Sequence, residues 1–238
     1  MTKAPLDDTA RWGRGWQKTR DWEAHSVGRA EADRIAAGYI RLLGKLNPAG
    51  KVAGKRGLGI GSGAGHLEAA LAAHGFDMVA SEWNEDGVCL LQLQNPDLKH
   101  RAVDLTSFDD TDAWDLIVCR ELYPFTRTNA FSQQIEIVSR LLDALRPGGV
   151  LLIVGSDVSS PHCLDYQLLL REVRSDPRVA QAIGPVLESL LKRMRWNPVS
   201  IVGYRLANAL AELVLQAINC LRKPRIAGIR AYAIRKAS

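Results

Sequence analysis

The middle of the chain, residues 51–156, alternates between short apolar runs and stretches with apolar residues three or four positions apart. Short apolar runs between glycines and polar residues predict strands, and the wider spacing predicts amphipathic helices. The elements should therefore alternate along most of this region. The strands are expected within 56–63, 76–83, 99–105, 113–122 and 148–156, and the helices within 66–75, 86–95 and 129–145.

The flanking regions are predicted to be mainly helical. Apolar residues at helical spacing indicate a helix before the middle region and several after it. One later helix is expected to start with Asp176 as N-cap and Pro177 in its first position. A stripe of apolar residues over 199–221 favours a core-facing helix, with an interfacial helix as the alternative. A last strand is expected at 228–236. No segment is assigned as the sixth strand, although 198–204 is a candidate. The predicted helices are 27–46, 163–174, 176–196 and 199–221.

This alternation predicts an α/β fold with a doubly wound, mostly parallel sheet of about seven strands. Helices should cover both faces, and a helical insertion should follow the fifth strand. We expect one domain with three parts. An N-terminal arm and helix occupy 1–50, a ligand-binding core occupies 51–156, and a helical cap or lid with the final strand occupies 157–238.

Composition is that of an ordinary globular protein, because 47% of the 238 residues are hydrophobic and 24% are charged. No apolar run approaches the length of a bilayer span, and the start lacks an apolar signal segment, so a cytoplasmic location is expected. The net charge of +5 is concentrated after residue 191. We interpret this basic region as solvated surface; nucleic acid, anionic lipid or a phosphorylated substrate are the alternatives.

Two further patterns have modest implications. Tryptophans alternate with basic residues over 12–22, which favours an arm that folds over its own domain and leaves stacking on nucleobases as an alternative. The four cysteines are far apart, without metal-ligand spacing. We therefore expect free, mostly buried thiols and no metal site.

A cluster of glycines follows the first predicted strand of the core, in the stretch "LGIGSGAGHLEAALAAHG". Glycine permits positive φ and leaves no Cβ between backbone and ligand. In doubly wound sheets, ligands bind at the carboxyl ends of the strands beside such a loop. Glu82 is expected at the end of the next strand, where its two oxygens could accept hydrogen bonds from ribose hydroxyls. Together these features predict a nucleoside-containing cofactor, although "GIGSGA" alone also satisfies the dinucleotide pattern GxGxxG/A.

The same stretch resembles the first motif of class I S-adenosylmethionine-dependent methyltransferases, which have a Rossmann-like fold. The segments "AVDL", "WDLIVCREL" and "LLDALRPGGVLLIV" resemble later motifs of that family in the same order, so the resemblance covers roughly residues 50–155. It implies S-adenosylmethionine as cofactor, with Glu82 on the ribose and Asp104 near the adenine amino group. One departure is Gly59, where the family commonly has an acid that helps to orient the glycine loop. The implied cofactor-binding residues are Gly61, Ser62, Gly63, Gly65, Glu82, Trp83, Asp104, Leu105 and Arg120.

The resemblance also places an acceptor beside the loops that follow the fourth and fifth strands. Glu121, Tyr123 and His162 are candidates for catalytic contacts or a base, and Asp157 is a further polar group there. The helical region after residue 162 is longer than the bare fold requires, and such segments usually form an acceptor pocket in this family. We therefore expect methyl transfer to a small organic acceptor, at an oxygen, nitrogen or carbon atom.

Three alternatives remain at this stage. The basic C-terminal region and the tryptophan-rich arm would suit an RNA methyltransferase. The departure at Gly59 would suit a noncatalytic cofactor-binding scaffold or partner subunit. A dehydrogenase is a more distant alternative, because the glycine pattern alone does not separate the two cofactors. The sequence does not indicate an oligomeric state.

Overall fold

The computed structural model describes residues 27–46, 52–122, 125, 131–156, 166–188, 209–210, 213 and 229–238. The tryptophan-rich arm and most of the expected helix at 199–221 lie outside these residues. So do Tyr123, Asp157 and His162, three of the residues expected near an acceptor.

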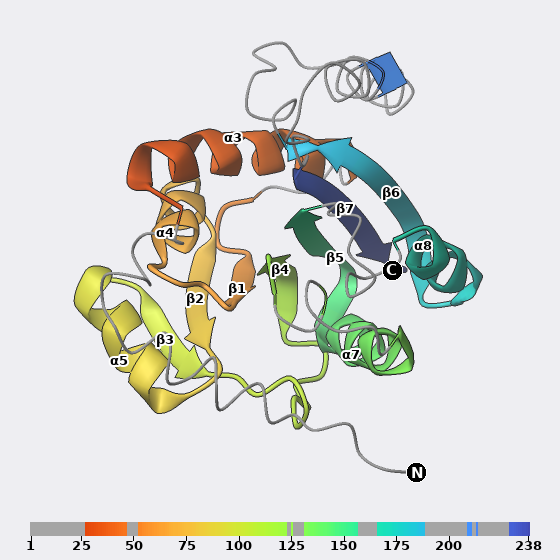
Figure 1. Ribbon diagram of the computed structural model, residues 1–238. Helices are drawn as coiled ribbons and strands as arrows, with labels where there is room; N and C mark the ends of the chain where they lie inside the picture. Colours follow the sequence, from red (N-terminus) through yellow and green to blue (C-terminus); the bar gives the residue numbers. More distant parts are fainter. Residues whose placement is uncertain are drawn as a thin grey trace, which may run out of the picture.

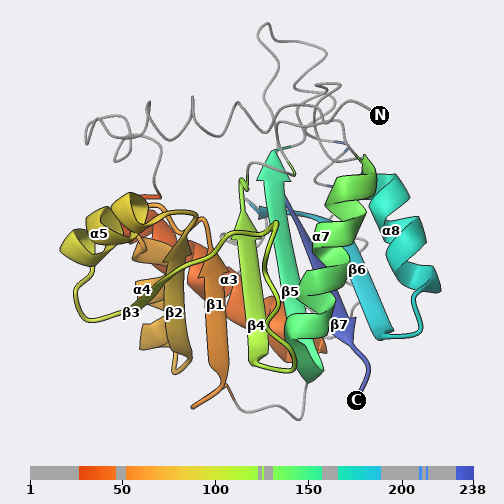
Figure 2. The ribbon, with the colours of Figure 1, turned by 90° about the horizontal axis from the view of Figure 1, so that it is seen from below.

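A seven-stranded sheet forms the centre of the molecule, in the order β3-β2-β1-β4-β5-β7-β6 (Figures 1 and 2). All neighbouring pairs from β3 to β5 are parallel, whereas β7 runs antiparallel to both β5 and β6. This confirms the predicted mostly parallel sheet. The strands are β1 (Arg56–Ile60), β2 (Asp77–Glu82), β3 (Lys99–Ala102), β4 (Trp114–Arg120), β5 (Leu145–Ser156), β6 (Val179–Leu187) and β7 (Ile229–Lys236).

Helices cover both faces of the sheet, as expected for a doubly wound fold (Figure 2). Successive residues of a strand point to opposite faces, so Leu116 and Val118 of β4 belong to one core cluster and Ile117 and Cys119 to the other. The first cluster includes the buried stripe of α3 and residues of α4, and the second includes α7 and α8. The helices are α3 (Arg29–Leu46), α4 (His66–Ala73), α5 (Glu85–Gln94), α7 (Phe131–Ala144) and α8 (Tyr166–Ser175).

The prediction of a helix over 176–196 is wrong for the part that the structure describes. Asp176 does not cap a helix; its Oδ1 accepts a hydrogen bond from the Arg178 backbone N–H at 2.9 Å and closes a turn. The strand β6 follows and pairs with β7, with a register shift between Ile183 and Val186 around Gly184. This strand is the sixth strand that the sequence pattern could not locate, and 198–204 is not described.

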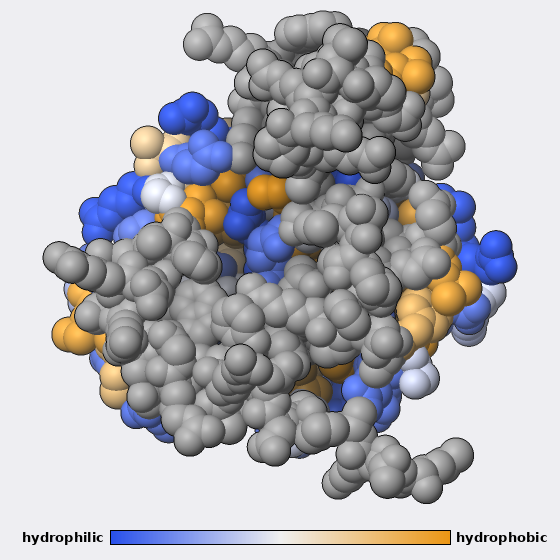
Figure 3. All heavy atoms as spheres, in the orientation of Figure 1, coloured by the Kyte–Doolittle hydropathy of each residue, from blue (hydrophilic) through white to orange (hydrophobic). Residues whose placement is uncertain are grey.

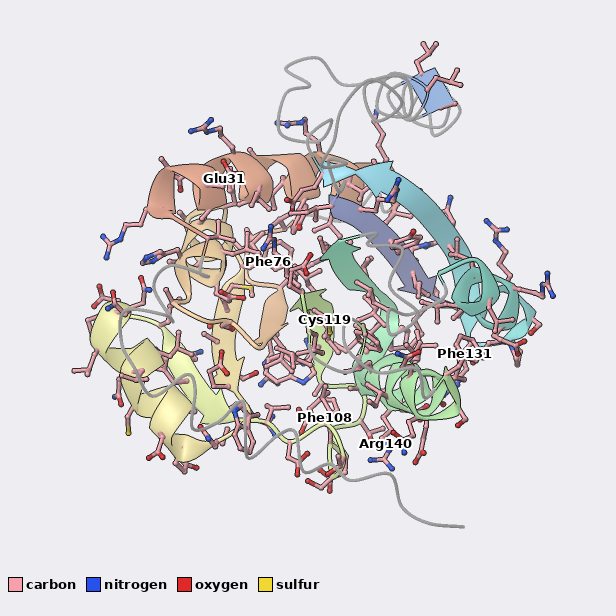
Figure 4. The ribbon with its side chains drawn as sticks, viewed as in Figure 1. Glu31, Phe76, Phe108, Cys119, Phe131 and Arg140 are labelled. Atoms are coloured by element: carbon pink, nitrogen blue, oxygen red, sulfur yellow. The ribbon has the colours of Figure 1, made fainter. Side chains whose placement is uncertain are left out.

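Two cysteines are described, and only one of them fits the expectation of buried thiols. Cys119 is buried in the centre of the sheet, near the position labelled in Figure 4, and burial raises the pKa of its thiol. Cys89 on α5 is exposed. Within the described ranges, no helix has the length and apolar character needed to cross a membrane. The outer helices instead present many hydrophilic side chains (Figure 3).

Candidate cofactor site

The glycine loop joins the end of β1 to the start of α4. Gly61, Gly63 and Gly65 all have positive φ, at 67°, 57° and 71°. Residues other than glycine rarely adopt this backbone conformation. Space is also restricted, because a Cβ on Gly61 would lie 2.9 Å from Leu122 Cδ1 and a Cβ on Gly65 would lie 2.5 Å from Leu91 Cδ1. The loop therefore needs glycine at these positions for both backbone conformation and packing.

Two serines tie the glycine loop to β2. The Ser62 N–H donates to the Ser81 carbonyl at 2.9 Å, and the Ser81 N–H donates to Ser62 Oγ at 3.1 Å. Both hydroxyls donate to the Gly59 carbonyl, at 3.1 Å from Ser62 and 2.7 Å from Ser81. This network fixes the loop against the strand that carries the predicted ribose-binding acid.

Glu82 lies at the carboxyl end of β2, directly beside the loop. Its Oε1 accepts a hydrogen bond from the Gly63 N–H at 2.7 Å. Burial raises the pKa of the Glu82 carboxyl to about 7, although hydrogen bonds from the Gly63 and Trp83 backbones oppose the shift. Trp83 follows with 48% of its surface exposed. The structure thus brings together the glycine loop and the acid that the sequence placed about twenty residues apart.

A second carboxyl beside the loop was not among the predicted site residues. Glu68 lies on α4 and is only 3% exposed. Burial raises its pKa to about 7; the Ser62 hydroxyl opposes this shift and the charge of Glu82 adds to it. Two carboxyls with raised pKa values in one region are typical of functional sites, because burial of a charge without a partner costs folding free energy.

The raised pKa values of Glu82 and Glu68 predict a pH dependence of stability in the cofactor-free protein. Between about pH 4.5 and 7, the folded state holds protons that the unfolded chain has lost. The free energy of unfolding should therefore fall as the pH rises through this window, by roughly 3 kcal/mol for each carboxyl. Urea denaturation at pH 5 and pH 7.5 measures the change. In the Glu68→Gln/Glu82→Gln double variant, the free energy of unfolding should no longer show this fall between the two pH values. If the double variant shows the same fall as wild type, these two carboxyls are not its cause.

Asp104 follows β3 at the same edge of the sheet. It is exposed, and its Oδ1 accepts hydrogen bonds from the Thr106 N–H and the Thr106 hydroxyl, both at 2.8 Å. The next residue, Leu105, is 8% exposed and belongs to the core. Asp104 therefore closes a local turn in this structure, and its expected contact with adenine stays a prediction.

The carboxyl end of β4 contributes Arg120 and Glu121. Arg120 forms an ion pair with Glu188, with Nε–Oε1 and Nη2–Oε2 distances of 3.2 Å each. Glu121 has a φ of 51°, an uncommon value for a residue with a side chain, and its N–H donates to the Val154 carbonyl at 2.7 Å. Backbone strain of this kind is often found at functional sites. The expected role of Glu121 as a contact or a base stays a prediction.

The partners of Arg120 form a buried network that the sequence did not indicate. Glu188 follows β6, its side chain is 1% exposed, and it accepts a hydrogen bond from the Tyr39 hydroxyl of α3 at 2.7 Å. Burial lowers the Arg120 pKa, but the charge and hydrogen bonds of Glu188, together with the charges of Tyr39 and Glu121, outweigh this effect and raise it. Burial and Glu188 also raise the pKa of the Tyr39 hydroxyl well above its usual value. In the sequence pattern, Tyr39 is one of the apolar positions that predict the helix over 27–46.

The part of the chain that the structure describes contains no group of three or more metal-ligating side chains that could hold an ion. Of the residues predicted from sequence, the glycines, Ser62, Glu82 and Trp83 lie around β1 and β2. Arg120 and Glu121 lie at the end of the neighbouring strand β4. These residues therefore lie at the carboxyl ends of adjacent parallel strands, the position at which ligands bind in doubly wound sheets.

Comparisons with known proteins identify the family and the fold. A family model described as a methyltransferase domain matches residues 28–198. A solved structure of the plantazolicin methyltransferase BpumL in complex with SAH is 14% identical, with a TM-score of 0.59, covering 91% of this chain and 88% of that chain. The N-methyltransferase NodS from Bradyrhizobium japonicum WM9, in complex with S-adenosyl-L-homocysteine, is 14% identical with a TM-score of 0.52, covering 84% and 86%.

A third structure of this fold has a different activity in its name. The [4+2]-cyclase SpnF is 16% identical, with a TM-score of 0.53, covering 87% of this chain and 82% of that chain. A search of curated proteins finds no match. At these identities the structural likeness shows the fold, and the chemistry must be argued from the site.

Proposed function

The chain belongs to the methyltransferase domain family, within the class I S-adenosylmethionine-dependent superfamily, and we propose that it transfers a methyl group from S-adenosylmethionine to a small organic acceptor. One observation carries the proposal. The Gly63 N–H of a loop with three positive-φ glycines donates to Glu82 Oε1 at 2.7 Å, so bare backbone and a carboxylate share one edge of the sheet.

The residues at this edge fit the cofactor that the resemblance implies. Gly61, Gly63 and Gly65 add no side chains of their own to the loop, as a closely approaching adenosine would require. One oxygen of Glu82 is held by the loop, and the carboxylate can accept hydrogen bonds from ribose hydroxyls through its remaining lone pairs. We assign the amino-acid end of the cofactor to the side of Arg120 and the adenine to the side of Trp83, Asp104 and Leu105.

Methyl transfer from a sulfonium is an in-line displacement, and S-adenosylmethionine supplies the activated methyl group. The chain's own task is to hold the acceptor and exclude water. Leu122 packs against the glycine loop, since its Cδ1 lies 2.9 Å from where a Cβ of Gly61 would be. Glu121, with its constrained backbone, would contact the acceptor or remove its proton. Tyr123 and His162 stay proposals for the same role.

The proposed acceptor class rests on architecture and on similar proteins. The plantazolicin methyltransferase has been solved with a triazolic desmethylPZN analog, and NodS is named an N-methyltransferase. We propose that residues 157–238 supply the acceptor pocket and final strand, 51–156 the cofactor-binding core, and 1–50 an arm and helix. The noncatalytic alternative is motivated by Gly59, where an acid would be usual. A noncatalytic scaffold would also bind the cofactor, so turnover of S-adenosylmethionine to S-adenosylhomocysteine is the measurement that separates it from an enzyme.

Glu82→Ala tests the proposed cofactor site. Loss of the carboxylate should weaken S-adenosylhomocysteine binding by about 1.5 to 3 kcal/mol, the scale of a hydrogen bond to a charged group. Titration calorimetry measures the affinity. Asp77→Ala is the matched control, because Asp77 begins the same strand at the opposite end and forms an exposed ion pair with Lys99 at 2.7 Å. Equal affinities for wild type and Glu82→Ala would remove Glu82 from the site.

A further inference from the structure

The space beside Gly59 is filled by a side chain from another element. Gly59 lies in the middle of the sheet, paired with Ala80 of β2 and Val118 of β4. A Cβ on Gly59 would lie 2.1 Å from Glu68 Oε1 and 2.6 Å from Glu68 Cδ. The carboxyl group of Glu68 therefore occupies the volume into which a side chain at position 59 would project.

Glu68 is an unusual residue for this position on α4. The helix buries Leu67, Ala70 and Leu71 against the sheet, and Glu68 is buried among them at 3% exposure. Its Oε2 has no hydrogen-bond partner within the described part of the protein. An uncompensated buried carboxylate is costly for folding, so its presence suggests a ligand with which it interacts.

The groups around Glu68 leave it without a full counter-charge. Ser62 of the glycine loop favours the ionised form, and Arg120 at the end of β4 also favours it. Glu82 of β2 opposes ionisation through like charge, and burial has the largest effect against it. Arg120 is itself paired with Glu188. A cation bound at the glycine loop would supply the missing compensation.

We propose that Glu68 is a positioning carboxylate of the cofactor site, which supports the glycine loop from α4 and faces the α-ammonium group at the amino-acid end of S-adenosylmethionine. The assignment rests on the proposed function. It also explains why position 59 is a glycine where the family commonly has an acid. The carboxylate comes from α4 instead of β1, and an acidic side chain at position 59 would collide with that of Glu68. Glu68 touches the loop rather than the reacting atoms.

Ligand truncation separates this role from a structural one. Glu68→Gln keeps the shape of the side chain and removes its charge. Its affinity for S-adenosylhomocysteine should fall about 10-fold, the scale of one charge-assisted contact. Its affinity for 5′-methylthioadenosine, which lacks the amino-acid end, should change less than about 2-fold. Glu136→Gln, on the exposed surface of α7, is the charge-matched control and should change neither.

Thermal stability gives a second readout. Because burial disfavours the charged form, Glu68→Gln without ligand at pH 8 should melt at the same temperature as wild type or a few degrees higher. A purely structural glutamate would give the opposite result, with a lower melting temperature and equal losses for both ligands. That outcome would overturn the proposal.

Moving the carboxylate back to the strand is the most direct test. Gly59→Asp alone should reduce S-adenosylhomocysteine affinity at least about 10-fold, because the new side chain meets Glu68. Glu68→Ala alone should also reduce it about 10-fold. The Gly59→Asp/Glu68→Ala double variant should recover to within about 3-fold of wild type.

The outcomes distinguish a failure of the Glu68 role from a failure of the proposed function. If wild type binds S-adenosylhomocysteine but Glu68→Gln binds it equally well, the Glu68 role is wrong and the proposed function stands. A double variant that folds and binds no better than the single variants also overturns the role. If wild type binds neither ligand, both proposals fail together.

Discussion

Gly63→Val should reduce S-adenosylhomocysteine binding at least about 100-fold while leaving the fold largely intact. Gly63 has a φ of 57°, which a β-branched residue adopts only at high cost, so the valine should rotate the peptide out of this conformation. Its N–H would then no longer donate to Glu82 Oε1, the contact that joins the loop to the acid. A branched side chain would also project from a position at which the loop now has backbone alone.

A second glycine provides the control for backbone strain. Gly54 also has positive φ, at 77°, but it precedes β1 at the opposite edge of the sheet, and a Cβ there would meet no atom within 4 Å. Gly54→Val should therefore lose a similar amount of stability, roughly 1 to 2 kcal/mol, without weakening binding. Calorimetry and urea denaturation of both variants provide the comparison. Normal binding by folded Gly63→Val would show that the loop does not hold the cofactor.

The part of the site that could be predicted from sequence is the part with local signals. Positive φ strongly favours glycine, so the loop at Gly61, Gly63 and Gly65 was visible as a cluster, and the short strand after it placed Glu82. The alternation of strands and helices likewise predicted the doubly wound sheet, because parallel strands need crossover connections. These features depend on residues that are close in sequence.

The errors and omissions come from long-range packing. The segment after Asp176 satisfies the rules for a helix start, but Asp176 caps a turn instead, and pairing with β7 makes the segment a strand. Glu68 was visible only as one polar residue of a predicted helix. Its position against Gly59 depends on how α4 packs on β1. A glycine where an acid is common, followed nine residues later by a lone glutamate in an apolar helix, is the signal that could have identified it.

The Tyr39–Arg120–Glu188 network is the clearest case of such long-range structure, and its disruption should have a large effect on stability. Glu188→Leu should lower the free energy of unfolding by about 3 to 5 kcal/mol, because it leaves the guanidinium of Arg120 without its partner. The Arg120 side chain is 17% exposed, so water can compensate only in part. The Tyr39 hydroxyl would lose its acceptor as well. Urea denaturation monitored by tryptophan fluorescence measures the loss.

Two comparisons make this prediction specific to a buried charge. Asp77→Ala removes the exposed Lys99–Asp77 ion pair, in which 64% and 43% of the side chains are exposed, and should cost less than about 1 kcal/mol. Removing both buried charges, in Glu188→Leu/Arg120→Met, should recover much of the stability, since no unpaired charge then remains. A Glu188→Leu variant as stable as Asp77→Ala would mean that the network does not hold α3, β4 and β6 together at the edge of the site.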